Sequence, residues 1–146
     1  CLPLLLAGKD IVVDVRNDGS GETACYLAML CLVVKGAGCQ VVVVVDEPQA
    51  VSPITRELQR ISTCLGVCVT ELSQPLIASA EVVVGSAIQV STSIDRTTLK
   101  GVRMLITHYT TDYELEQSFT IQLLNLLPLF HPNVQRIATS RFNNLQ

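Results

Sequence analysis

Short apolar runs alternate with longer segments of helical periodicity along most of the chain. The clearest run is Val41–Val45, five consecutive valines that have the length and the β-branched composition of a buried strand. Glycine, proline and polar residues separate the apolar segments. The pattern predicts strands over residues 11–15, 41–45, 67–72, 81–84, 102–107 and 134–139. It predicts helices over residues 23–34, 52–65 and 115–127, and a short helix or turn over residues 86–93.

This alternation of strands and helices predicts an α/β fold with one parallel sheet, because parallel strands need crossover connections. The composition agrees: 49% of the residues are hydrophobic and 16% are charged, which suits a sheet with helices on both faces and excludes a disordered chain. A chain of 146 residues can bury one core. We therefore expect residues 1–146 to form a single domain. Because the first residue is Cys1, we expect a fragment of a longer protein.

The charge and the cysteine content argue against several functional classes, namely strong RNA binders, metal-binding proteins and secreted or membrane proteins. The net charge is −3 and the ten lysines and arginines are scattered, so RNA binding by this domain alone is expected to be weak. The six cysteines lack paired zinc-site spacing, which argues against a metal site. Cys25 and Cys31 are expected to be buried in a helix. No secretory signature or membrane-length apolar run is present, so we expect a cytoplasmic protein with reduced cysteines and no membrane partner.

A glycine-rich turn follows the first predicted strand and precedes an apolar helical segment. This is the layout of a phosphate-binding loop, whose pattern is G-x-x-x-x-G-K-[ST]. In such loops the lysine reaches the β- and γ-phosphates and the hydroxyl binds magnesium. Here the lysine position is a glutamate and the first glycine position is Arg16. We call this segment the relic phosphate loop; it consists of Gly19, Ser20, Gly21, Glu22 and Thr23.

The glutamate at position 22 opposes nucleotide binding. A lysine about 4 Å from a phosphate gains roughly 4 kcal/mol at an effective dielectric constant of about 20, and a glutamate there loses a similar amount. Because about 1.4 kcal/mol corresponds to a tenfold change in affinity, ATP should bind very weakly unless Arg16 supplies a replacement charge. The alternative is an ordinary strand, turn and helix with no phosphate-binding ancestry.

Six segments in sequence order resemble motifs of one family. They are residues 2–11 (LPLLLAGKDI), 18–24 (DGSGETA), 80–85 (AEVVVG), 101–105 (GVRML), 119–128 (FTIQLLNLLP) and 132–135 (PNVQ). Together they resemble, over nearly the whole chain, the first RecA-like domain of DEAD-box RNA helicases. The resemblance implies a RecA-like, P-loop NTPase-like domain: a parallel sheet with helices on both faces.

The family's functional residues are changed at the matching positions. Its RNA-contacting P-T-R-E-L motif falls on residues 46–50 (DEPQA), whereas the literal Thr55–Leu58 comes two helical turns later and is interpreted as ordinary helix surface. Its T-P-G-R segment falls on residues 86–89 (SAIQ), without the arginine. Registered on the following helix, the DEAD box falls on Tyr109, Thr110, Thr111 and Asp112; registered on the preceding strand, it starts at His108. Its Ser-Ala-Thr motif falls on Ser140, Arg141 and Phe142.

Without the DEAD carboxylates, no group would hold magnesium or the attacking water. The resemblance therefore implies no catalytic residue, no cofactor and no metal. His108 is interpreted as a structural or surface residue, because no Ser-His-Asp or Cys-His arrangement accompanies it.

These observations predict a catalytically inactive, DEAD-box-like scaffold or interaction module in RNA silencing, including the piRNA pathway, or in RNP assembly. The decayed motifs resemble those of the Tudor-domain helicase-like (Yb) group. Expected partners are proteins of such a complex or a second copy of the chain, and the expected location is the cytoplasm, including perinuclear RNP granules. One alternative is ATP-independent RNA binding together with a second RecA-like domain. The other is a residual RNA-dependent ATPase that uses Arg16.

Overall fold

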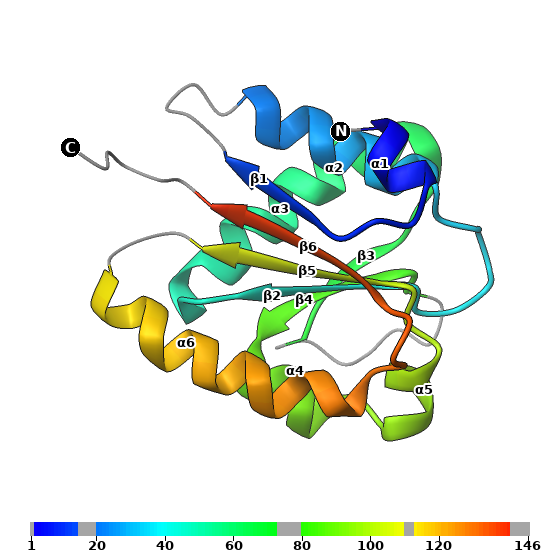
Figure 1. The fold of residues 1–146 in the computed structure, drawn as a ribbon. Coiled ribbons are helices and arrows are strands. Elements are labelled where there is room, and N and C mark those ends of the chain that lie inside the picture. The colour runs from blue at the N-terminus through cyan, green and yellow to red at the C-terminus, as the bar shows by residue number, and fades with distance from the viewer. Residues whose placement is uncertain (1, 15–19, 73–79, 110–112, 141–146) are drawn as a thin grey trace.

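The computed structural model describes residues 2–14, 20–72, 80–109 and 113–140 (Figure 1). Its strands form one sheet in the order β1-β6-β5-β2-β4-β3, and every neighbouring pair is parallel. The strands are β1 (Ile11–Asp14), β2 (Val41–Val45), β3 (Val69–Glu71), β4 (Val82–Ser86), β5 (Met104–Tyr109) and β6 (Gln135–Ser140). All six lie within one or two residues of the predicted strands, and the predicted α/β fold is confirmed.

Helices cover both faces of this sheet (Figure 1). The α-helices are α1 (Leu2–Leu6), α2 (Ser20–Cys31), α3 (Val51–Ser62), α4 (Ala87–Ser93), α5 (Arg96–Lys100) and α6 (Tyr113–Leu126). Short 3-10 turns follow or precede some of them, at η1 (Pro48–Ala50), η2 (Thr63–Leu65) and η3 (Leu127–Leu129). α1, α2 and α3 pack on one face, and α4, α5 and α6 pack on the other.

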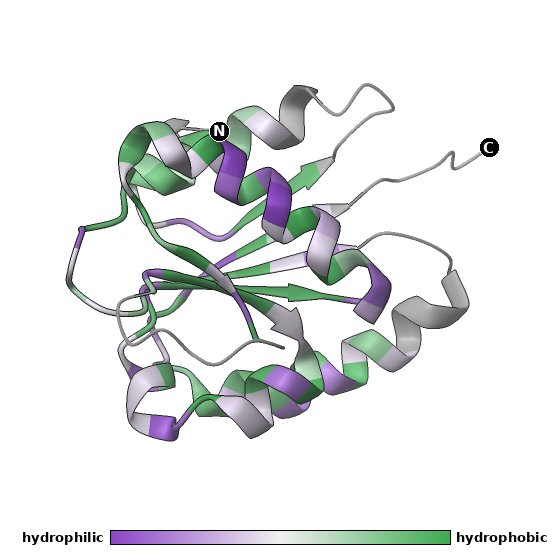
Figure 2. Cartoon of the chain, turned by 180° about the vertical axis from the view of Figure 1, so that it is seen from behind, coloured by the Kyte–Doolittle hydropathy of each residue, from purple (hydrophilic) through white to green (hydrophobic). Residues whose placement is uncertain are grey.

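The valines of β2 explain why the core has two halves. Successive side chains of a strand point to opposite faces. Val41, Val43 and Val45 therefore pack with α2 and α3, and Val42 and Val44 pack with α4 and α6. All five are at most 1% exposed, so β2 is the central buried strand of the domain. In Figure 2 the strands are largely coloured as hydrophobic, as expected for a buried sheet.

The first long helix differs from its prediction at both ends. We expected a turn over residues 19–21 and a helix over 23–34, but α2 begins at Ser20 and ends at Cys31. At its end, the side chain of Gln40 captures the backbone of Val34: Val34 N donates to Gln40 Oε1 (2.8 Å), and Gln40 Nε2 donates to Val34 O (2.6 Å). This contact, made by a residue six positions later in the chain, replaces the bonds that would continue the helix. Cys31 is exposed, so the prediction that it is buried is wrong; Cys25 is buried as predicted.

Two short helices were not predicted. α1 packs Leu5 into the core. α5 is capped by the preceding residue, Asp95, whose carboxylate accepts a hydrogen bond from Thr98 N (2.7 Å). Helices of five residues are too short for a periodic pattern to reveal them. Among the described residues, no helix is both long and apolar enough to cross a bilayer.

Candidate functional site at the carboxyl ends of the strands

The carboxyl ends of β1, β6, β5 and β2 meet at one edge of the sheet, which we call the carboxyl edge (Figure 1). Ligands of open α/β sheets bind outside this edge. Helix α2 begins there, so the described part of the relic phosphate loop, residues 20–23, forms the first turn of a helix. Tyr109 pairs with Ser140 in the strand register, so the predicted DEAD and Ser-Ala-Thr positions are adjacent. The other predicted site residues lie outside the described residues: Gly19, Thr110, Thr111, Asp112, Arg141 and Phe142.

A cluster of hydrogen-bonded side chains lies beneath this edge. Nδ1 of His108, on β5, lies 2.9 Å from the hydroxyl of Tyr26 on α2 and 2.9 Å from the hydroxyl of Thr139 on β6. The three residues are 5%, 2% and 1% exposed, respectively. We call this set the buried polar cluster. It joins the helix that follows the relic phosphate loop to two strand ends, and it gives His108 a structural role, in keeping with its interpretation from the sequence.

The next residue of β5 packs on the opposite face of the sheet. The ring of Tyr109 meets the ring of Phe119 on α6 edge to face, with the ring centroids 4.9 Å apart. Edge-to-face pairs of this kind add about 1 kcal/mol beyond their buried area. The two last residues of β5 therefore anchor helices on the two faces of the sheet.

Thr23, the retained hydroxyl of the relic phosphate loop, faces the neighbouring helix. Its hydroxyl donates to Glu57 Oε1 on α3 at 3.5 Å, and Glu57 also forms an ion pair with Arg60 (2.7 Å). The Arg60 guanidinium is the main cause of the lowered pKa of Glu57. Thr23 and Glu57 therefore link α2 to α3.

The literal Thr55–Leu58 segment is only partly surface. Arg56 is exposed, but Thr55 is 3% exposed and Leu58 is fully buried. The prediction of ordinary helix surface is wrong for these two residues. They lie three residues apart on the face of α3 that packs against the sheet. Val51 and Ser62 lie on the same face of the helix.

The segment matched to T-P-G-R caps a helix. Ser86 Oγ accepts a hydrogen bond from Gln89 N (3.3 Å), and Gln89 Oε1 accepts one from Ser86 N (2.9 Å). This reciprocal capping box starts α4. The short helix that the sequence left open over residues 86–93 therefore forms.

Among the described residues of the carboxyl edge, no cluster of three or more metal-binding side chains (histidine, cysteine, aspartate or glutamate) is found. Magnesium is held by carboxylate, phosphate and water oxygens. The side chains of the buried polar cluster are instead bonded to one another. Sequence reasoning missed Tyr26 and Thr139, because a tyrosine in an apolar helix and a threonine in a strand carry no motif.

The fold is that of the RecA-like domains of DEAD-box proteins. A DEAD-box protein from the hyperthermophile Methanococcus jannaschii superposes with a TM-score of 0.78 at 19% identity, over 98% of this chain and 42% of that chain. Saccharomyces cerevisiae Dbp5, in a complex with Nup159, Gle1, IP6 and ADP, gives a TM-score of 0.77 at 14% identity, over 99% and 41%. A hypothetical ATP-dependent RNA helicase from Sulfolobus tokodaii gives 0.69 at 20% identity, over 96% and 43%.

These likenesses concern the fold, because the identities are low. The chain spans about two fifths of the length of each of these three structures. No protein-family profile and no curated protein sequence matches it.

Proposed function

We propose that this chain is a catalytically inactive, DEAD-box-like RecA domain that acts as a protein-interaction module. The observation that carries this proposal is the buried polar cluster. His108, at the end of the strand where the DEAD motif registers, is bonded to Tyr26 and Thr139 within the domain. The His108 side chain therefore stabilises the fold, and as an imidazole it supplies no carboxylate to a metal ion.

The charge at the relic phosphate loop supports the same proposal. Residue 22 is a glutamate in the first turn of α2, where a phosphate-binding loop needs a lysine. The N-terminus of a helix attracts anions, and a negative residue in its first turn weakens that attraction for a phosphate. Because the loop lysine and the DEAD-box carboxylates are both missing, we infer that the domain serves to bind partners through its surface and not to hydrolyse ATP.

The interaction role draws on the fold comparison. The Dbp5 structure contains the proteins Nup159 and Gle1, so a DEAD-box protein of this fold assembles with protein partners. By analogy, we propose a scaffold role in cytoplasmic RNP assembly or in piRNA-type RNA silencing. The proposed kinship with the Tudor-domain helicase-like group rests on the changed motifs of the sequence and not on this comparison. A second copy of the chain is an alternative partner, which sedimentation would reveal; a strict monomer without any partner would contradict the scaffold role.

The test of inactivity is RNA-stimulated ATP hydrolysis. Phosphate release is measured with magnesium, ATP and single-stranded RNA for the wild type and for Glu22→Lys, which restores the charge at position 22. The proposal predicts no release above background for the wild type, and none for Glu22→Lys, because the DEAD carboxylates are still missing. RNA-dependent release by the wild type that is lost in Thr23→Ala would contradict it.

ATP-independent RNA binding is a second candidate function, favoured by the likeness to RNA helicase structures. Affinity for single-stranded RNA would then fall steeply with salt, with a slope that reports the number of phosphate contacts. Flat titrations at low and high salt, with this domain and with a two-domain protein, would remove this candidate.

A further inference from the structure

A cavity of about 570 Å³ lies at the edge of the sheet opposite the carboxyl edge, where strands β5 and β6 begin. Its volume is in the range of ordinary ligand sites. The lining comes from α1, from the segment between α5 and β5, and from the loop before β6. We call it the amino-edge cavity; the lining residues that matter here are Leu5, Leu6, Lys100, Arg103, His131 and Gln135.

The amino-edge cavity is basic although the chain is acidic overall. Lys100, Arg103 and His131 line it, and none of its lining residues is an aspartate or glutamate. The net charge of the whole chain is −3 with histidine counted as neutral, so Lys100 and Arg103 form a local concentration of positive charge, and His131 adds a polar donor beside them. Such a concentration attracts anionic partners through the field it creates.

Each of these three residues keeps at least one hydrogen-bond donor for a ligand. Arg103 is exposed, and in the described part of the chain its guanidinium has no hydrogen bond or ion pair. Lys100 Nζ donates to the carbonyls of Pro128 (3.3 Å) and Phe130 (3.1 Å), which leaves one of its three N–H groups. His131 Nδ1 accepts a hydrogen bond from Asn133 N (3.0 Å), so the neutral ring carries its proton on Nε2.

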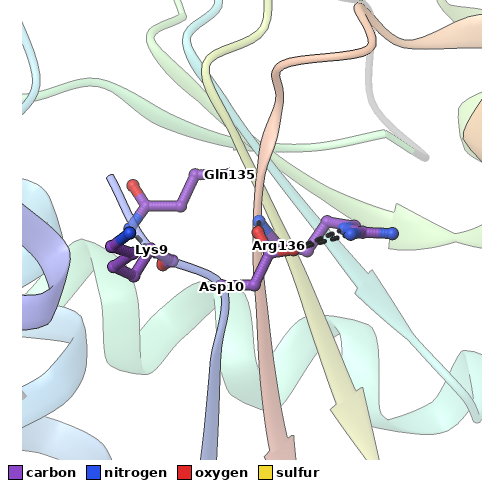
Figure 3. A network of polar contacts seen from close by, with 4 residues as sticks. All are labelled: Lys9, Asp10, Gln135 and Arg136. Carbon is purple, nitrogen blue, oxygen red and sulfur yellow. Dashed lines mark hydrogen bonds and ion pairs between the residues drawn. The ribbon is translucent and has the colours of Figure 1, made fainter. Parts of the chain in front are cut away.

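One wall of the cavity is fixed by bonds between β6 and the segment that leads into β1 (Figure 3). Gln135 Nε2 donates to Lys9 O (2.8 Å) and to Leu5 O (3.4 Å). Arg136, whose side chain points away from that of Gln135 in Figure 3, forms an ion pair with Asp10 (2.6 Å). The negative charge of the nearby Asp10 carboxylate is thus paired with Arg136. The hydrogen bonds also order this wall before any ligand binds, which lowers the entropic cost of binding.

Apolar side chains lie beside the cations. Leu6 is 65% exposed, which is high for a leucine, and Leu5 is buried beneath it. Among the described residues, no phenylalanine, tyrosine or tryptophan lines the cavity, and its one aromatic ring is the imidazole of His131. Base stacking on aromatic rings is a main source of affinity for single-stranded nucleic acid, so the lining favours a peptide over RNA.

We propose that the amino-edge cavity binds a short segment of a partner protein that combines acidic side chains with an aliphatic one. Carboxylates of that segment contact Arg103, Lys100 and His131, and its aliphatic side chain packs on Leu6. This inference rests on the proposed role as an interaction module and names the chemistry of the partner. Peptide binding at the amino-edge cavity does not depend on whether the carboxyl edge binds a nucleotide.

The test is fluorescence anisotropy with three labelled hexapeptides. The acidic probe is Glu-Asp-Leu-Leu-Asp-Glu, the neutral probe is Gln-Asn-Leu-Leu-Asn-Gln, and the third probe replaces both leucines of the acidic peptide with serine. We expect the acidic leucine probe to bind with a Kd below about 1 mM. Binding should weaken with added salt, and both other probes should bind at least threefold more weakly.

Matched arginine variants locate the site. Arg103→Gln should weaken the acidic probe about threefold to tenfold, because a charge-assisted contact is lost. Arg96→Gln removes the same charge from α5, outside the lining, and should leave the affinity unchanged. Leu6→Ala should weaken binding at least threefold, and a thermal melt of each variant checks that it is folded.

Four results would overturn the site: no binding of the acidic probe, equal binding of the neutral probe, equal effects of Arg103→Gln and Arg96→Gln, or displacement of the peptide by oligouridine RNA. Failure of this site is distinguishable from failure of the proposed function. ATP hydrolysis with intact peptide binding contradicts inactivity alone, and loss of peptide binding with no ATP hydrolysis contradicts the cavity alone.

Discussion

Removal of one hydroxyl from the buried polar cluster should measurably destabilise the domain. Tyr26→Phe keeps the ring that packs beside His108 but deletes the oxygen that lies 2.9 Å from Nδ1. Both residues are at most 5% exposed, so no bulk water replaces the lost contact at low cost. A buried hydrogen bond of this kind contributes about 1 kcal/mol net, and we expect Tyr26→Phe to lower the free energy of unfolding by that amount.

The assay is urea denaturation followed by circular dichroism. A loss of about 1 kcal/mol lowers Tm by roughly 3 °C for a domain of this size, and the urea midpoint falls without a change in slope. Thr139→Val removes the other hydroxyl near His108 Nδ1 and should cost a similar amount. Because both hydroxyls approach one nitrogen, the double variant should depart from additivity by about 0.5–1 kcal/mol.

Thr92→Val is the matched control, because it makes the same replacement at an exposed hydroxyl on α4. It should change stability by less than about 0.5 kcal/mol. A Tyr26→Phe protein with an unchanged midpoint, or strict additivity with Thr139→Val, would refute the view that these side chains act as one cluster.

Three further changes probe other parts of the structure. Gly85→Ala places a methyl group 2.7 Å from Leu72 Cδ1 and 3.2 Å from Gln89 Oε1, so it should cost about 1–3 kcal/mol in a urea melt; no loss would show that Leu72 yields freely. Leu58→Ala empties a fully buried site on α3 and should cost about 2–5 kcal/mol in the same assay, whereas the exposed Arg56→Ala should cost less than about 0.5 kcal/mol. The backbone N–H and then the guanidinium of Arg136 lower the pKa of Asp10, so its stabilising contribution is present above its ordinary pKa, near 4, and is lost as pH falls through the lower folded value. Asp10→Asn should therefore flatten the acid side of the plot of stability against pH, and an unchanged acid limb would contradict this assignment.

The periodicity of the chain was enough to predict the sheet. Runs such as Val41–Val45 leave few alternatives to a buried strand, and the alternation with helical segments leaves few alternatives to parallel pairing. The ends of the elements were less predictable. The end of α2 depends on the side chain of Gln40, and α5 depends on one capping residue, Asp95. A periodic pattern does not contain such contacts.

The candidate site was predictable in position but not in content. The resemblance matched Tyr109 to the DEAD box and Ser140 to the Ser-Ala-Thr motif, and the structure pairs these two residues on neighbouring strands. The partners of His108 could not be foreseen, since Tyr26 and Thr139 are 82 and 31 residues away in sequence and meet only in the folded sheet. The amino-edge cavity was missed for the same reason, because Leu6 and His131 join Lys100 and Arg103 only in the folded chain.

Equilibrium binding of magnesium–ATP decides whether the carboxyl edge still accepts a nucleotide. Isothermal titration calorimetry of the wild-type chain, with a nucleotide-binding DEAD-box protein as positive control, measures this binding without any need for turnover. We predict no saturable heat up to about 1 mM ATP, because residue 22 is a glutamate where a phosphate-binding loop has a lysine. A saturable, magnesium-dependent titration with a micromolar Kd would show that the carboxyl edge has kept its nucleotide site.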